Sequence, residues 1–224
     1  MLHKVKIRAA TQDSHKTSKL SVERIEGYDF TPGQATEVVL DQQGDRDNSS
    51  LFTFTSLSGY PYIGFSIKTY PERHGELEKM WSLQGGDYLL TSHPWGAIDY
   101  QGSGMFIADG AGITPFRSIF RDLHNQGELQ KNISFTRITT GATSLPPLNS
   151  RQAPVIMPVS TQTEEGEGEG FQQGRIDSSV LRGFLGRIKP DYCYVCGTTD
   201  VAEDAISALK ELEIDNSKIV CENS

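Results

Sequence analysis

The sequence predicts a β-barrel domain followed by a three-layer α/β domain, joined near residue 101. Two observations support this division. The first hundred residues hold short β-rich segments separated by Gly, Pro, Asp and Ser, whereas strand-like and helix-like segments alternate after Gly102. The length of 224 residues also suits two domains of about 100 residues each. We therefore expect domains at residues 1–101 and 102–224.

The first domain is expected to contain six strands and one helix-like stretch from His74 to Ser82. Short strands at regular spacing indicate a closed barrel or a sandwich. The six segments are Val5 to Ala9, Leu20 to Ile25, Thr36 to Leu40, Leu51 to Ser56, Tyr62 to Tyr70 and Tyr88 to Thr91.

The second domain alternates strands and helices, which is typical of a parallel sheet joined by right-handed crossovers. The expected strands are Gly104 to Ala108, Ile133 to Ile138, Ala153 to Val159, Tyr192 to Cys196 and Lys218 to Cys221. The expected helices are Pro115 to Asn125, Ser178 to Ile188 and Val201 to Leu212.

The charge and composition narrow the class of partner. A formal net charge of −8 argues against a nucleic acid or an anionic membrane as the main partner. No apolar run reaches the roughly 18 residues of a membrane helix, and the first residues lack the apolar core of a signal peptide. We therefore expect a cytoplasmic protein without a membrane partner, and we expect it to be a monomer.

The strongest local signal is a buried strand that runs through a glycine turn into a helix, from Ile107 to Phe116. Gly110 and Gly112 allow a ligand to approach the backbone, and Pro115 suits the first turn of the helix. The amides at such a helix start bind anions such as a dinucleotide pyrophosphate. Many helices also begin after a glycine turn without binding phosphate, so both interpretations stay open.

The strand from Phe52 to Ser56 also has two interpretations. An aromatic ring beside a hydroxyl group can stack on a flat heterocycle and hydrogen-bond its edge. Ordinary alternation would instead place Phe52 and Phe54 in the core and the threonines outside.

A thiol and a glycine, Cys196 and Gly197, follow at the carboxyl end of a strand, where open α/β sheets bind ligands. Cys193 precedes them by only a few positions, and a CxxC pair can indicate redox or metal chemistry. The two cysteines are expected on opposite faces of one strand, so we predict neither a disulfide nor a metal site.

Five motifs in one order resemble the ferredoxin–NADP reductase superfamily, from about Val5 to Glu222. They are Pro32-Gly33-Gln34, Phe52-Thr53-Phe54-Thr55-Ser56, Gly110-Ala111-Gly112-Ile113-Thr114-Pro115, Gly174-Arg175-Ile176 and Cys196-Gly197. The resemblance is greatest to small bacterial FAD-binding reductases with only two core domains. It implies a six-stranded antiparallel Greek-key barrel that binds FAD, and an α/β domain that binds NADPH or NADH.

The resemblance also implies a reaction and a set of site residues. The reaction is hydride transfer from nicotinamide C4 to FAD N5, with electrons passed on to an external acceptor, either a small redox protein or a small molecule. Cys196 and Thr53 are the implied catalytic residues. The implied flavin contacts are Phe52, Thr53, Phe54, Ile67, Lys68, Thr69, Gly75 and Glu76. The implied dinucleotide contacts are Gly110, Gly112, Ile113, Thr114, Pro115, Arg137, Cys196 and Gly197.

Several positions depart from the family pattern. Ser50 stands where the family has an arginine for the flavin pyrophosphate, Leu77 where it has a serine or threonine, and Asp109 where it has a glycine. A charge-assisted contact between an arginine and a phosphate contributes about 1.5–3 kcal/mol. The absence of that arginine at Ser50 therefore predicts weaker flavin binding. These departures are the reason for an alternative hypothesis, an electron-transfer or regulatory subunit with a weakened cofactor site.

Overall fold

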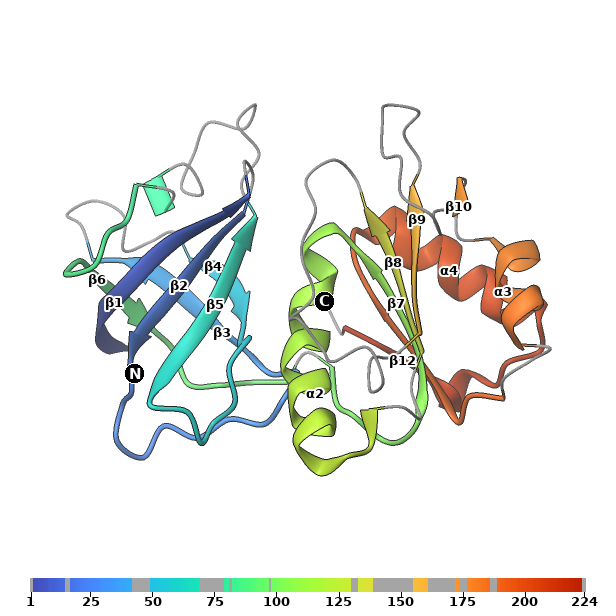
Figure 1. The fold of residues 1–224 in the computed structure, drawn as a ribbon, viewed down its shortest axis with the longest axis horizontal. Helices are drawn as coiled ribbons and strands as arrows, with labels where there is room; N and C mark the ends of the chain where they lie inside the picture. Colours follow the sequence, from blue (N-terminus) through green and yellow to red (C-terminus); the bar gives the residue numbers. More distant parts are fainter. Residues whose placement is uncertain are drawn as a thin grey trace.

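The computed structural model describes residues 2–14, 17–41, 49–68, 79–80, 82–96, 98–129, 133–138, 155–160, 172–173, 177–185 and 189–222. Figure 1 shows a barrel beside an α/β part, with one helix, α2 (Ile113–Gln126), standing between them. Within these described ranges, no helix has both the length and the apolar character that a membrane crossing requires.

The barrel is one antiparallel sheet with the strand order β4-β3-β6-β1-β2-β5. Its strands are β1 (His3–Ser14), β2 (Thr17–Glu23), β3 (Ala35–Leu40), β4 (Ser50–Thr53), β5 (Tyr62–Lys68) and β6 (Tyr88–Thr91). The two end strands meet where the amide of Thr55 donates to the carbonyl of Gly64 at 2.8 Å. This confirms the predicted six-stranded antiparallel barrel.

Alternate residues of each strand fill the barrel interior, as the period of a strand requires. On β5, Ile63, Phe65 and Ile67 are each at most 1% exposed. The first two predicted strands, Val5 to Ala9 and Leu20 to Ile25, were too short at their facing ends, since β1 and β2 extend toward each other to the pairing of Ser14 with Thr17. Polar residues fill this extension, so no hydrophobic pattern marked it.

The α/β part contains a parallel sheet with the strand order β10-β9-β8-β7-β11-β12. The strands are β7 (Gly104–Asp109), β8 (Ile133–Ile138), β9 (Val155–Ser160), β10 (Gln172–Gln173), β11 (Tyr192–Cys196) and β12 (Ile219–Cys221). The other elements are α2, α3 (Ser178–Leu185), α4 (Thr199–Glu211) and the 3-10 turns η1 (Gly110–Gly112) and η3 (Asn216–Lys218). Among these strands, β10, with two residues, was not predicted.

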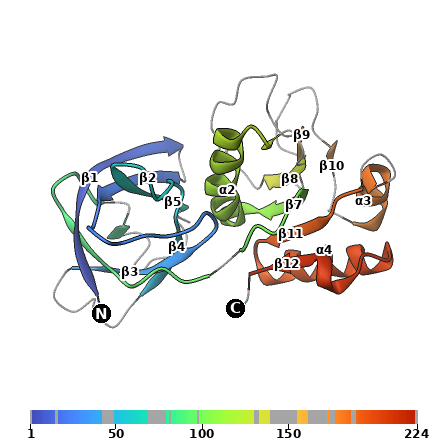
Figure 2. The same ribbon diagram turned by 90° about the horizontal axis from the view of Figure 1, so that it is seen from below.

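Helices cover both faces of this sheet, which confirms the predicted three layers (Figure 2). Phe106 and Tyr194 pack with α2 on one face, whereas Met105 packs with α3 and α4 on the other. Cys193 belongs to the second of these cores and Cys196 to the first. The two thiols therefore lie on opposite faces of β11, as predicted, and both are free.

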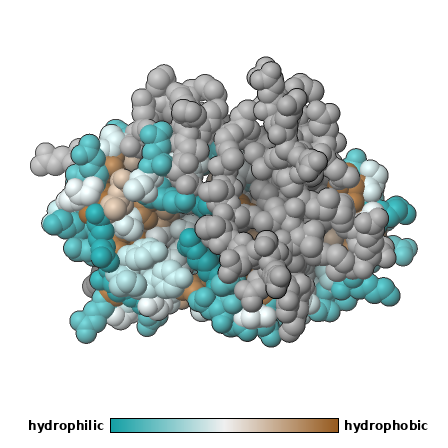
Figure 3. Space-filling model, viewed as in Figure 1, coloured by the Kyte–Doolittle hydropathy of each residue, from teal (hydrophilic) through white to brown (hydrophobic). Residues whose placement is uncertain are grey.

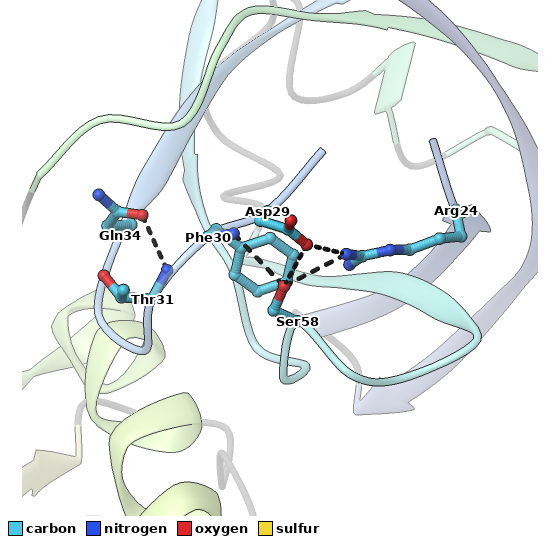
Figure 4. A network of polar contacts seen from close by, with 6 residues as sticks. All are labelled: Arg24, Asp29, Phe30, Thr31, Gln34 and Ser58. Atoms are coloured by element: carbon cyan, nitrogen blue, oxygen red, sulfur yellow. Dashed lines mark hydrogen bonds and ion pairs between the residues drawn. The ribbon is translucent and has the colours of Figure 1, made fainter. Parts of the chain in front are cut away.

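A polar network fixes the loop that leads from β2 to β3 (Figure 4). Arg24 Nη2 lies 2.6 Å from Asp29 Oδ1 and 3.2 Å from Ser58 Oγ. Farther along the loop, the amide of Thr31 donates to Gln34 Oε1 at 2.9 Å. These hydrogen bonds restrict the conformation of the loop between Arg24 and Gln34.

Gly33 lies inside this loop and joins the barrel to α2. Its amide donates to Ser118 Oγ on α2 at 2.9 Å, and its carbonyl accepts from the amide of Ile98. Its φ of +94° favours glycine, and a Cβ atom there would lie 2.0 Å from the carbonyl oxygen of Ile98. Arg117 adds a second link, because its Nη1 donates to Ser66 Oγ on β5 at 3.0 Å.

Candidate functional site

A pocket of about 550 Å³ lies at the carboxyl end of β11 and takes its lining from both domains. The barrel contributes Leu51 and Trp95, which are 42% and 41% exposed. The α/β part contributes Cys196, Gly197 and Glu222, among others. The volume is in the range of small-molecule and cofactor sites.

Cys196 contributes a neutral thiol to this pocket. Its Sγ donates to Glu222 Oε2 at 3.3 Å, and the side chain is only 5% exposed. Burial raises the pKa of Cys196, and the neighbouring Glu222 carboxylate raises this pKa further. The thiol therefore acts as a hydrogen-bond donor, not as a thiolate nucleophile.

The predicted dinucleotide loop lies beside this pocket, since β7 and β11 are neighbours in the sheet. A Cβ atom on Gly112 would lie 2.1 Å from the carbonyl oxygen of Cys196, so the loop packs directly against the end of β11. Gly110 has a φ of +56°, in the left-handed region that favours glycine. Thr114 Oγ1 donates to the carbonyl of Ala111 at 2.8 Å and closes the turn.

Helix α2 begins from this turn with Gly112 as its N-cap, and no side chain caps it. Its first-turn residues Ile113 and Pro115 are buried. These two side chains therefore anchor the helix in the core, while the amides of the first turn are the groups suited to an anion.

Asp109 places a carboxylate at the same edge of the sheet. It is 5% exposed, and its Oδ2 accepts a hydrogen bond from Thr198 Oγ1 at 3.1 Å. A Cβ atom on Gly197 would lie 2.8 Å from Asp109 Cβ, so these two loops are in close contact. In the pairing of β7 with β8, Asp109 lies opposite Arg137, whose side chain is outside the described residues.

The two aromatic rings of the predicted flavin strand follow ordinary alternation. Phe52 is 9% exposed and packs near Phe65, with ring centroids 6.1 Å apart. Phe54 is fully buried and stacks on Phe30, with ring centroids 4.0 Å apart, so its ring belongs to the barrel core. Thr53 is half-buried and lies on the same side of β4 as Leu51.

The remaining predicted flavin contacts are only partly described. Ile67 is 1% exposed in the barrel interior, and Lys68 ends β5. Thr69, Gly75, Glu76, Leu77 and the Gly174-Arg175-Ile176 motif lie outside the described residues. The cofactor roles of all these positions stay predictions.

Most of the lining residues were not predicted as site residues, Leu51, Trp95 and Glu222 among them. Glu222 follows β12, and only the pairing of β11 with β12 brings it to Cys196. Leu51 and Trp95 are far from β11 in the sequence. Because the pocket forms between domains, no local pattern could have indicated these contacts.

The fold is that of the two-domain FAD- and NAD-binding reductases. The chain is similar to the FAD/NAD-binding domain of nitric oxide dioxygenase from Vibrio cholerae, with a TM-score of 0.80, 16% identity and coverage of 97% and 96% of the two chains. It is also similar to a ferredoxin–NADP reductase from Neisseria gonorrhoeae with bound FAD and NADP, with a TM-score of 0.77, 16% identity and the same coverage. No family model matches the sequence.

The sequence is also similar to one subunit of the Na⁺-translocating NADH-quinone reductases. The protein from Yersinia pseudotuberculosis is 30% identical over 125 residues, which cover 44% of this chain and 31% of the relative. The protein from Serratia proteamaculans is 25% identical over 221 residues, which cover 81% of this chain and 53% of the relative. The chain therefore spans about half or less of these relatives.

Proposed function

We propose that this chain is an NAD(P)H-dependent flavoprotein oxidoreductase that binds FAD on the barrel and a nicotinamide dinucleotide at the sheet edge. The observation that carries this proposal is the pocket shared by the two domains at the ends of β11 and β4. A ferredoxin–NADP reductase of similar fold binds FAD and NADP, and the relatives found by sequence are NADH-quinone reductase subunits. Bound together, the two cofactors supply hydride transfer from nicotinamide C4 to flavin N5.

The residues of the pocket fit a flat ring that carries an amide. Glu222 offers carboxylate oxygens to an amide N–H, and the Cys196 thiol holds one of those oxygens in place at 3.3 Å. Leu51 and Trp95 form an apolar wall from the opposite domain, which favours the exclusion of water. The amides at the start of α2 would receive the pyrophosphate.

We further propose that the electron acceptor is external, either a redox protein or a small molecule, and that the protein is a cytoplasmic monomer. The net charge of −8 supports a soluble partner. The relatives are subunits of a larger reductase, so the alternative outcome is a stable complex. Size-exclusion chromatography of the protein from its native host separates a monomer from a complex.

The proposal is tested by the absorbance spectrum of the protein, as purified and after addition of FAD. We expect a flavin spectrum that NADPH or NADH bleaches in the absence of oxygen. A protein that binds no FAD, or one that binds FAD and is not reduced by either dinucleotide, would contradict the proposal. Turnover with an artificial acceptor, without any other protein, would contradict the alternative of a regulatory subunit.

The role of Cys196 can be tested against a matched control on the same strand. Cys196→Ala is expected to slow flavin reduction by about tenfold, because Glu222 loses the donor that orients it. Cys193→Ala removes a thiol from the opposite face of β11 and should leave the rate unchanged. Equal rates in both variants would show that the nicotinamide lies elsewhere.

A further inference from the structure

The pocket at Cys196 is larger than the corner that Cys196 and Glu222 form beside β11 and β12. Its volume of about 550 Å³ is in the range of sites for drug-sized ligands, and a nicotinamide ring occupies only part of it. The rest of the described lining is mostly apolar, with Leu51, Trp95, Val195, Ala202, Ile206 and Cys221. The pocket therefore offers apolar surface to a flat compound once the dinucleotide has left.

The barrel wall of this pocket exposes large apolar side chains. In the described part of the chain four large hydrophobic residues are exposed, and two of them, Leu51 and Trp95, line this pocket. By comparison, the described surface over β1, β2 and α2 is mostly hydrophilic (Figure 3). Exposed apolar side chains that gather in a cavity indicate a surface that a ligand or partner covers.

The facing wall of the pocket is one side of α4. Thr199, Ala202, Glu203 and Ile206 recur at helical spacing, so their side chains lie together on the side of α4 that lines the pocket. Ala202 and Ile206 are half-buried, whereas Glu203 is exposed and forms no ion pair with any residue in the described ranges. Glu203 therefore brings a negative charge to a largely apolar wall.

The charges around the pocket are negative on three sides. Glu203 lies on α4 and Glu222 follows β12, and both line the pocket. Glu37 is exposed and lies directly opposite Leu51 in the pairing of β3 with β4, so the two side chains share one face of the barrel. Among the described lining residues there is no Lys, Arg or His. An anion that enters would be repelled, since these charges act over roughly 8–10 Å at moderate salt.

We propose that the external electron acceptor is a flat aromatic compound without negative charge, which enters this pocket after the dinucleotide has left, and that Glu203 helps to exclude anionic acceptors. The inference rests on the proposed function and names the acceptor class for the same site. For a quinone the reaction balances when NAD(P)H gives one hydride and the solvent gives one proton. The quinone gains two electrons and two protons, and the dinucleotide leaves as NAD(P)⁺.

Calorimetry on the oxidised, FAD-loaded protein tests the proposal without any electron transfer. The probes are three anthraquinones that share one ring system and carry a neutral hydroxymethyl, an anionic sulfonate or a cationic trimethylammonium-methyl group. We expect the sulfonate to bind at least about fivefold more weakly than the neutral compound, with a gap that narrows as salt is added. NADP⁺ should compete with all three probes, because the nicotinamide fills the same pocket.

Two pairs of variants test the walls of the pocket. Glu203→Gln should lower the ratio of neutral to anionic affinity by about twofold or more, whereas Glu211→Gln, at the other end of α4, should leave this ratio unchanged. Leu51→Ser should weaken all three probes by about threefold or more, because apolar contact area is lost. Leu2→Ser removes another exposed leucine, outside the described lining, and should have no effect.

Four results would overturn the proposal. Equal affinity for the sulfonate and the neutral compound would remove the charge selection, and equal ratios in Glu203→Gln and Glu211→Gln would remove the role of Glu203. Binding that NADP⁺ does not affect would place the acceptor elsewhere. Binding of none of the probes to a protein whose FAD is reduced by NADPH would point to a protein acceptor. Reduction of FAD by NADPH is measured without any acceptor, so failure of the proposed function is recognised separately.

Discussion

At the scale of single residues, the three free thiols occupy different environments, and this difference predicts their reactivity. Burial raises the pKa of Cys193 from an ordinary value of 9.0 to about 11, and the pKa of Cys196 is raised as well. Cys221 is half-buried and lines the pocket. Since the thiolate is the reactive form, burial and protonation together protect the first two.

Alkylation by iodoacetamide at pH 8, followed by mass spectrometry, checks this prediction. Cys221 should be modified first and should be protected by NADP⁺, while Cys193 and Cys196 stay unmodified. Modification of Cys193 should rise only as the pH approaches about 11. The pKa of Cys193 returns to about 9 on unfolding, so the thiolate form favours the unfolded state. The free energy of unfolding should therefore fall as the pH rises from about 9 toward about 11. Rapid modification of Cys196 at pH 8 would contradict the buried thiol.

The negative charge of the Asp109 carboxylate leads to a second prediction. Its carboxylate lies at the edge where the pyrophosphate is proposed to bind, so Asp109→Asn should tighten NADPH binding by about two- to tenfold. The amide oxygen of the new side chain can still accept from Thr198. Asp191→Asn, at the amino end of β11, removes the same charge far from the site. Dissociation constants for NADP⁺ check both, and equal values in the two variants would refute the electrostatic argument.

At the scale of the elements, the turn η1 depends on the absence of a side chain at Gly112. Gly112→Ala should destabilise the protein by about 2–4 kcal/mol, because the new Cβ meets backbone atoms of Cys196 that cannot move away. Gly183→Ala is the matched control, since this helical position has open space and should gain about 0.5–1 kcal/mol. Urea unfolding monitored by circular dichroism measures both. Equal stability of Gly112→Ala and the wild type would refute the close packing.

The bounds of the strands and helices also show which parts of the fold could be predicted from the sequence. Strands with a clear alternating or continuous apolar pattern, such as β5, β7 and β11, were predicted nearly to the residue. The extensions of β1 and β2 were missed because polar residues fill them, and their pairing depends on the hairpin. The start of α2 was predicted two residues late, since the glycine turn continues directly into the helix at Ile113.

The hydroxyl group of Tyr194, on β11, binds the chain segment that joins the two domains. Its hydroxyl accepts from the amides of Gln101 and Gly102, each at 3.0 Å, and donates to the Gly102 carbonyl at 2.8 Å. Tyr194→Phe should therefore cost about 1–3 kcal/mol in the free energy of unfolding. Tyr60→Phe changes a half-buried tyrosine in a loop and should lower the free energy of unfolding much less. Similar losses in the two variants would show that these bonds add no stability.

At the scale of the whole molecule, the order of motifs predicted the architecture, because strand ends and glycine turns can be recognised in the sequence, while the cofactor roles at the sheet edge stay predictions. The composition of the pocket was not predictable, since Leu51 and Trp95 reach it through the packing of two domains, and Glu222 meets Cys196 only through the pairing of β11 with β12. The rings of Phe52 and Phe54 pack in the barrel core, and a contact of either residue with the flavin stays a prediction.

We propose that the two cofactor rings meet in the pocket between Leu51, Trp95 and Cys196. A crystal structure of the protein with FAD and NADP⁺ tests it most directly. We predict the nicotinamide between Cys196 and Trp95, with its C4 atom about 3–3.5 Å from flavin N5. A nicotinamide ring bound outside this pocket, or a flavin held too far away for hydride transfer, would contradict the account.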